Sequence, residues 1–128
     1  MNYSHDYNSV YVPAMPIVEI SIQNVGTGKQ SETFTAIIDS GADSCIFPTS
    51  VLKSIGSESI RRSQMVGAAN IGFQVELHLV IVHLGQITVY GVEAVAERQN
   101  RDAIIGRNVL NQLVVTLNGL AGVTEITD

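Results

Sequence analysis

Apolar and polar residues alternate along much of this chain, a pattern typical of β-strands with one buried face. In residues 17–23, every second position from Val18 to Ile22 is apolar, and the positions between carry polar side chains. A second run, residues 33–38, follows a glycine-containing turn at residues 26–29. We therefore expect these two strands to pair as an antiparallel hairpin.

The same pattern continues through the middle and the end of the chain. A long strand follows Gly72, and a further strand covers residues 87–96, where the alternation slips at Gly91 as it does at a β-bulge. Residues 114–117 and 123–126 are two more strand candidates. A further apolar run, residues 103–105, ends at a glycine, and with it the sequence predicts seven or eight short strands.

Only two stretches carry helix signals. Residues 47–56 have a proline near the start and a glycine at the exit, and residues 107–113 place Leu110 and Leu113 on one side. Because strands predominate and helix is scarce, we predict an all-β fold, a closed barrel formed by one domain. The polar start, residues 1–12, has no sustained period and is expected to be a flexible arm, so that the domain covers residues 13–128.

Composition narrows the possible functions. The chain has 128 residues, with 7 basic and 12 acidic side chains and a formal charge of -5, which is the wrong sign for binding nucleic acid. No segment reaches the ~18 apolar residues of a membrane span. The single cysteine, Cys45, has apolar neighbours and is expected to be a buried, reduced thiol, which favours a cytoplasmic setting. His78 and His83 fall on opposite faces of a strand, so we expect no metal and no cofactor.

One apolar stretch, AIIDSGADSCIF at residues 36–47, carries the candidate chemistry. Asp39 ends a buried strand, and the serine and glycine after it allow a sharp, hydrogen-bonded turn. A lone buried carboxylate takes up a proton, so such a residue is useful only when a second carboxylate shares that proton. No other aspartate lies in a similar sequence, and we expect the partner to be Asp39 of a second copy in a two-fold dimer. An ordinary Asx turn is the alternative explanation of Asp-Ser-Gly taken alone.

Two blocks, residues 36–43 and 104–110, resemble the two signature motifs of the retropepsin-like aspartic proteases, and the resemblance spans residues 14–118. It implies a homodimeric β-barrel endopeptidase that acts on peptides or proteins, with Asp39 as the catalytic residue. Many members of this family have threonine where this chain has Ser40. Serine keeps the hydroxyl that the family uses to interlock the two active-site loops, but it lacks the methyl group.

The resemblance also assigns supporting roles, which we carry over as expectations. The residues expected to support the active-site loop are Ser40, Gly41, Ala42, Asp43, Ile105, Gly106 and Arg107. The residues expected to form a flap that closes over the substrate are Gly67, Ala68, Ala69, Asn70, Ile71 and Gly72. Asp43 and Arg107 match positions that form an ion pair within one subunit of retroviral relatives, and we predict that pair here.

Purely structural roles are the alternative to these assignments. The Gly67–Gly72 segment is also compatible with a plain surface hairpin, and Arg107 with a solvated helix charge. For the whole chain, the second hypothesis is a module of the same fold that dimerises or binds peptides without cleaving them. The intact Asp39-Ser40-Gly41 triplet argues against it, because a binding module has no need of carboxylates that share a proton.

Ala42 leads to a prediction about pH. A hydroxyl-bearing residue at this position could donate a hydrogen bond to the catalytic carboxylates and favour their ionised form, which alanine cannot do. We therefore expect the rate of peptide cleavage to peak at a less acidic pH than in gastric-type relatives. A pH–rate profile that peaks below about pH 3 contradicts this expectation.

Overall fold

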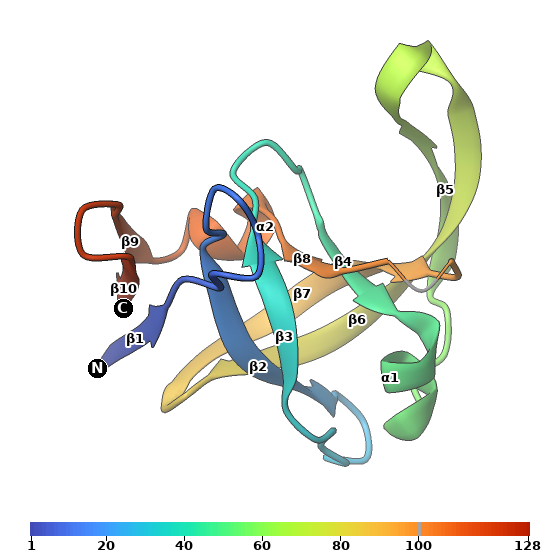
Figure 1. The fold of residues 1–128 in the computed structure, drawn as a ribbon. Coiled ribbons are helices and arrows are strands. Elements are labelled where there is room, and N and C mark those ends of the chain that lie inside the picture. Colours follow the sequence, from blue (N-terminus) through green and yellow to red (C-terminus); the bar gives the residue numbers. More distant parts are fainter. Residues whose placement is uncertain (100) are drawn as a thin grey trace.

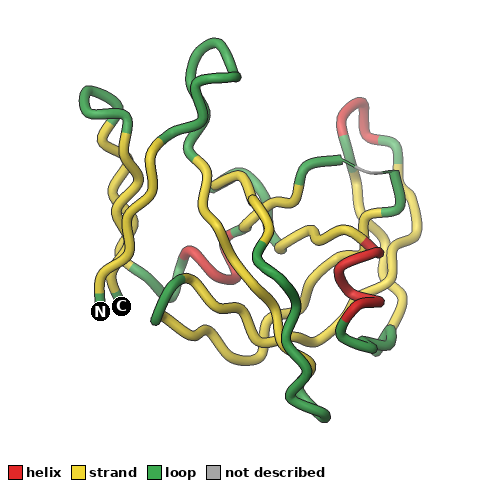
Figure 2. The backbone as a smooth tube through the Cα atoms, turned by 60° about the horizontal axis from the view of Figure 1, so that its bottom comes forward, coloured by secondary structure: helices red, strands yellow, loops and turns green. Residues whose placement is uncertain are grey.

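The structure, a computed structural model, describes residues 1–99 and 101–128. Its described part contains ten strands and three short helical segments. The strands are β1 (Asn2–Asp6), β2 (Ile17–Asn24), β3 (Phe34–Ile38), β4 (Cys45–Pro48), β5 (Arg61–Val66), β6 (Gly72–Leu84), β7 (Ile87–Glu97), β8 (Ala103–Ile105), β9 (Val114–Asn118) and β10 (Val123–Thr127). The helical segments are α1 (Thr49–Ser54), the 3₁₀ turn η1 (Ala68–Asn70) and α2 (Arg107–Leu110), and Figure 2 shows how little of the chain they occupy.

Six strands close into a barrel. The main sheet has the order β2-β3-β8-β4-β7-β6-β5, and an additional pairing of β2 with β6 closes the ring and leaves β5 outside it. The predicted all-β closed barrel is confirmed, as is the antiparallel hairpin of β2 and β3. The bulge expected at Gly91 is also present, because the register with β6 passes from Val80↔Val92 to Val82↔Val89 and leaves an extra residue on β7.

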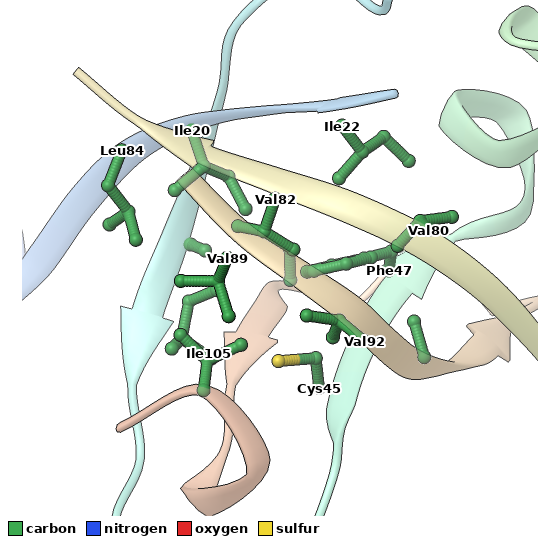
Figure 3. Packing of buried hydrophobic residues seen from close by; sticks show 14 of the residues in the cluster. Ile20, Ile22, Cys45, Phe47, Val80, Val82, Leu84, Val89, Val92 and Ile105 are labelled. Carbon is green, nitrogen blue, oxygen red and sulfur yellow. The ribbon is translucent and has the colours of Figure 1, made fainter. Parts of the chain in front are cut away.

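The inside of the barrel is filled by aliphatic side chains. Figure 3 shows the centre of this core, where side chains from both halves of the chain interdigitate. Phe47 is fully buried, and its ring meets that of Phe34 edge-on with centroids 5.6 Å apart. The Cys45 thiol lies in the same cluster and forms no disulfide, as the sequence predicted. Burial raises the pKa of the Cys45 thiol to about 12.

The two ends of the chain form a second, smaller sheet, with the order β1-β10-β9 (Figure 1). The segment expected to be a flexible arm, residues 1–12, thus contains a strand that the sequence did not predict, because residues 2–6 pair along their whole length with β10. The hydroxyl of Tyr3 accepts a hydrogen bond from the Glu19 N–H at 2.8 Å and donates one to the Glu19 carbonyl at 3.3 Å. These contacts attach the terminal sheet to the barrel.

A second strand that the sequence did not predict is β5. Its residues are mostly exposed, because it lies outside the closed ring and pairs only with β6. Such a strand needs no apolar face, and its sequence therefore lacks the alternation by which strands such as β2 and β6 were found. Among the residues that the structure describes, no helix has the length and apolar character that crossing a membrane requires.

The Tyr3 contacts give a testable prediction for stability. Tyr3→Phe removes the hydroxyl and leaves the partly buried Glu19 N–H without its partner, so we expect the free energy of unfolding to fall by about 1–2 kcal/mol. Urea denaturation at fixed protein concentration measures the change. Tyr90→Phe, at a tyrosine that is 71% exposed, is the matched control and should leave stability unchanged. Equal midpoints for the two variants would show that the terminal sheet is not held through Tyr3.

Candidate active site

Asp39 lies directly after β3, at the start of the loop that joins β3 to β4. Its Oδ1 atom accepts the Gly41 N–H at 2.9 Å, and its carbonyl oxygen accepts the Ala42 N–H at 3.2 Å. The first bond is the Asx turn that Asp-Ser-Gly favours. Ser40 and Gly41 are exposed at the tip of the loop, and within the described chain the Asx turn is the only hydrogen bond of the Asp39 side chain. The loop thus presents a half-buried carboxylate that can accept further hydrogen bonds.

The segment after β8 lies against this loop from the other side. The Asp39 N–H donates to the Ile105 carbonyl at 3.0 Å, and the Arg107 N–H donates to the Ala42 carbonyl at 2.8 Å. Gly106, between these two contacts, approaches the loop so closely that a Cβ atom on it would lie 2.5 Å from the carbonyl oxygen of Ser44. Only glycine fits here, because the obstacle is backbone rather than a movable side chain.

The predicted ion pair between Asp43 and Arg107 is confirmed. One guanidinium nitrogen of Arg107 bonds Asp43 Oδ1, and the other donates to the Ser40 carbonyl at 2.8 Å. The Asp43 side chain is 85% exposed, so the pair itself adds only about 0–1 kcal/mol to stability. Its effect is geometric, because one side chain ties both ends of the Asp39 loop to the start of α2.

Asn108 supports the same region, and the sequence analysis assigned it no role. Its side-chain oxygen accepts the Cys45 N–H at 3.0 Å, and its amide nitrogen donates to the Glu93 carbonyl at 2.8 Å. The amide thereby links α2 to β4 and to β7 at once. The sequence feature that could have pointed to Asn108 is a polar residue next to the buried Val109, on the short helix α2.

A row of aliphatic residues runs across the outer face of the barrel beside Asp39. Each member lies opposite the next in the strand register, so that all of them point to the same side of the sheet. In strand order, the row is Ile17, Ile37, Ile104, Ile46, Val95 and Leu77. None of these residues belongs to the main core cluster, which lies on the inner face of the same strands. We call this row the external aliphatic row.

The hairpin of β5 and β6 projects from the end of this row (Figure 1). Its tip contains the six predicted flap residues, with Ala69 and Asn70 both at positive φ and a Gly67 N–H bond to the Ile71 carbonyl of 3.2 Å. The sequence thus located the tip of a hairpin correctly, and its role as a flap remains a prediction. None of the described hydrogen bonds joins the tip to the Asp39 loop.

A hollow of about 320 Å³ lies between the hairpin and the barrel wall. Its apolar lining comes from Ile46, Met65, Phe73, Val75, Val95 and Ala96. Its polar lining comes from Gln74, Glu76, Glu97, Arg98, Gln99 and Arg101. Because Ile46 and Val95 also belong to the external aliphatic row, the hollow continues the apolar surface that begins beside Asp39.

A six-stranded closed barrel with an Asp-Ser-Gly loop after its second strand and a projecting hairpin defines the class of retropepsin-like folds. A retropepsin-like aspartic protease from Rickettsia conorii matches with a TM-score of 0.64 and 8% identity, over 100% of this chain and 94% of that chain. The retroviral protease-like domain of Ddi1 from Leishmania major matches with a TM-score of 0.52 and 21% identity, over 81% of each chain. At these identities, the likeness shows the fold.

The family follows from the sequence itself. The family model described as "gag-polyprotein putative aspartyl protease" matches residues 10–112. This chain therefore belongs to the gag-polyprotein aspartyl protease family, as the two motifs predicted. No curated protein matched it in sequence.

The close contact at Gly106 predicts the consequence of one added methyl group. Gly106→Ala forces the Ser44 backbone to move, and we expect a loss of about 2–4 kcal/mol of stability together with a displaced Asp39 loop. Gly119→Ala is the matched control, because nothing lies within 4 Å of its added Cβ atom. Denaturant unfolding of both variants measures the difference. A Gly106→Ala variant as stable as Gly119→Ala would mean that the two segments do not pack as described.

Proposed function

We propose that this chain is an aspartic endopeptidase whose active site forms when two copies pair around a two-fold axis, each supplying Asp39. The observation that carries the proposal is the state of Asp39 in a single chain. One carboxylate oxygen is fixed by the Gly41 N–H, and the other accepts no hydrogen bond from residues 1–99 or 101–128. It is thus free to meet a water molecule and a second carboxyl group.

The need for two copies follows from the number of suitable aspartates. The chain contains one Asp-Ser-Gly sequence, and the loop that carries it is exposed at Ser40 and Gly41, where a second copy could approach. Two carboxylates brought together at an axis cannot both ionise without strong repulsion, so they share one proton. The pair then contains one ionised carboxylate, which can act as a base, and one protonated carboxyl group, which can act as an acid.

In the proposed reaction, the ionised carboxylate takes a proton from water while the water oxygen attacks the carbonyl carbon of the peptide bond. The protonated Asp39 of the other copy donates its proton to the carbonyl oxygen, which gives a tetrahedral diol. As the C–N bond breaks, the first carboxyl protonates the leaving nitrogen, and the diol returns a proton to the second carboxylate. The pair ends with the single proton it started with, and no acyl-enzyme forms.

The external aliphatic row supports the choice of a peptide as substrate. Its half-buried members Ile37, Ile104 and Ile46 provide apolar surface between Asp39 and the hollow under the β5–β6 hairpin, and the hairpin offers backbone groups to an extended chain. We therefore expect cleavage between apolar side chains of an extended peptide.

The test is cleavage of a peptide library, with mass spectrometry of the products. Wild type should cleave, a statine-type transition-state mimic should inhibit, and Asp39→Asn should lower kcat by about 1,000-fold or more because the pair loses its base. Glu58→Gln, which removes an exposed charge in the α1–β5 connection, should retain full activity. No cleavage at any pH by a verified dimer would overturn the proposal and favour the module that binds peptides or dimerises without cleaving.

A further inference from the structure

The loop between β1 and β2 is closed by backbone hydrogen bonds. At its start, the Tyr7 N–H donates to the Gly122 carbonyl at 2.8 Å, and across its neck Asn8 and Met15 exchange two backbone hydrogen bonds of 2.8 and 3.1 Å. In Figure 1 it is the dark blue loop that stands next to the β3–β4 loop. A loop closed in this way holds its side chains in place at a lower entropic cost than a free arm.

Near the tip of this loop, Tyr11 reaches a residue 91 positions away. Its hydroxyl donates a hydrogen bond of 2.8 Å to Oδ2 of Asp102, which directly precedes β8. A hydrogen bond to a carboxylate is stronger than one between neutral groups, and this bond raises the pKa of the Tyr11 hydroxyl above its ordinary value. Because the hydroxyl stays protonated over the physiological pH range, it remains able to donate this bond.

The position of this bond relates it to the candidate active site. In the sheet, β3 lies between β2 and β8, so the link from the loop before β2 to the residue before β8 spans β3. This strand carries Ile37 of the external aliphatic row and ends at Asp39. The loop between β1 and β2 ends beside the last residue of β3, where the Pro16 carbonyl accepts the Ile38 N–H at 3.2 Å. The base of the loop therefore lies at the Asp39 end of β3, whereas Asp102, which precedes Ala103 opposite Ala36 in the parallel register, lies beside the start of β3.

Asp102 is also the end of the connection from β7 to β8, and this connection borders the hollow under the hairpin. Glu97, Arg98, Gln99 and Arg101 all contribute to its lining. Tyr11 thus holds Asp102, and the neighbouring Arg101, with Arg98 and Gln99, lines the hollow.

We propose that Tyr11 is a positioning residue: through its hydrogen bond to Asp102, it holds the adjacent Arg101 in the wall of the hollow under the β5–β6 hairpin and thereby sets the size of substrate side chain that the hollow accepts. The substrate part rests on the proposed function. We call the Tyr11–Asp102 hydrogen bond the clamp. The clamp is a property of the fold and can be tested without any enzymatic activity.

The clamp is tested by limited digestion of the whole protein with trypsin. The connection contains two trypsin sites, after Arg98 and after Arg101, and Lys29 in the β2–β3 turn serves as an internal reference. Tyr11→Phe removes only the hydroxyl, and we expect cleavage at the two arginines to become about fivefold faster relative to Lys29. Tyr90→Phe is the matched control and should leave the ratio unchanged. A general loss of stability would accelerate all sites together, so an unchanged ratio for Tyr11→Phe overturns the clamp.

The substrate part is tested by kinetics on peptides that differ only in the size of the side chains next to the scissile bond. Tyr11→Phe should raise KM about three- to tenfold with kcat within twofold of wild type, and it should reduce the preference among side-chain sizes. Asp102→Ala should have the same effect, and the double variant should add little to either single variant because both remove one interaction.

Each outcome decides one part of the proposal. If the tryptic ratio rises while KM and the size preference stay at wild-type values, the clamp stands and its role in selecting substrates is wrong. If wild type cleaves no peptide, the proposed function fails, with the role in selecting substrates, and the tryptic ratio alone decides the clamp.

Discussion

The close approach of Gly106 to the carbonyl of Ser44 is the contact on which the geometry of Asp39 depends. It allows the strand end at Ile105 to receive the Asp39 N–H and the start of α2 to donate to Ala42. Arg107 and Asn108, the next two residues, then reach the loop and the neighbouring strands with their side chains. A side chain at position 106 would separate the two segments, and all of these hydrogen bonds would lengthen together.

The barrel strands near this contact are apolar on both faces, which links the fold to the site. Their inner residues form the core, and their outer residues form the external aliphatic row. This explains why the sequence around Asp39 shows unbroken apolar runs, such as residues 36–38 and 103–105, whereas residues 17–23 alternate. Leu77 and Val95 of this outer face are covered within the chain, in a second buried cluster with Val75. The half-buried Ile37, Ile104 and Ile46 leave apolar surface beside Asp39, and a peptide is one way to cover it.

The sequence predicted what depends on local patterns. The Asp39 loop, the β2–β3 hairpin and the bulge at Gly91 follow from short motifs or from period-two alternation, whereas the Asp43–Arg107 pair was predicted from the family resemblance. It did not predict β1, whose partner β10 lies at the far end of the chain, nor β5, which has no buried face to produce a pattern. The two hydrogen bonds from the Asn108 side chain to backbone groups, and the bond of Tyr11 to Asp102, depend on the folded arrangement and cannot be predicted from the nearby sequence.

The central claim is that one catalytic site is built from Asp39 of two chains, and mixing of subunits tests it most directly. Wild-type protein is equilibrated with an equal amount of the Asp39→Asn variant, and peptide cleavage is measured at a fixed amount of wild-type chain. If two copies share a site and pair at random, half of the wild-type chains are captured in inactive hybrids, and activity falls to about half. Activity that stays constant as the variant is added would show that a single chain carries a complete site, and would contradict the account.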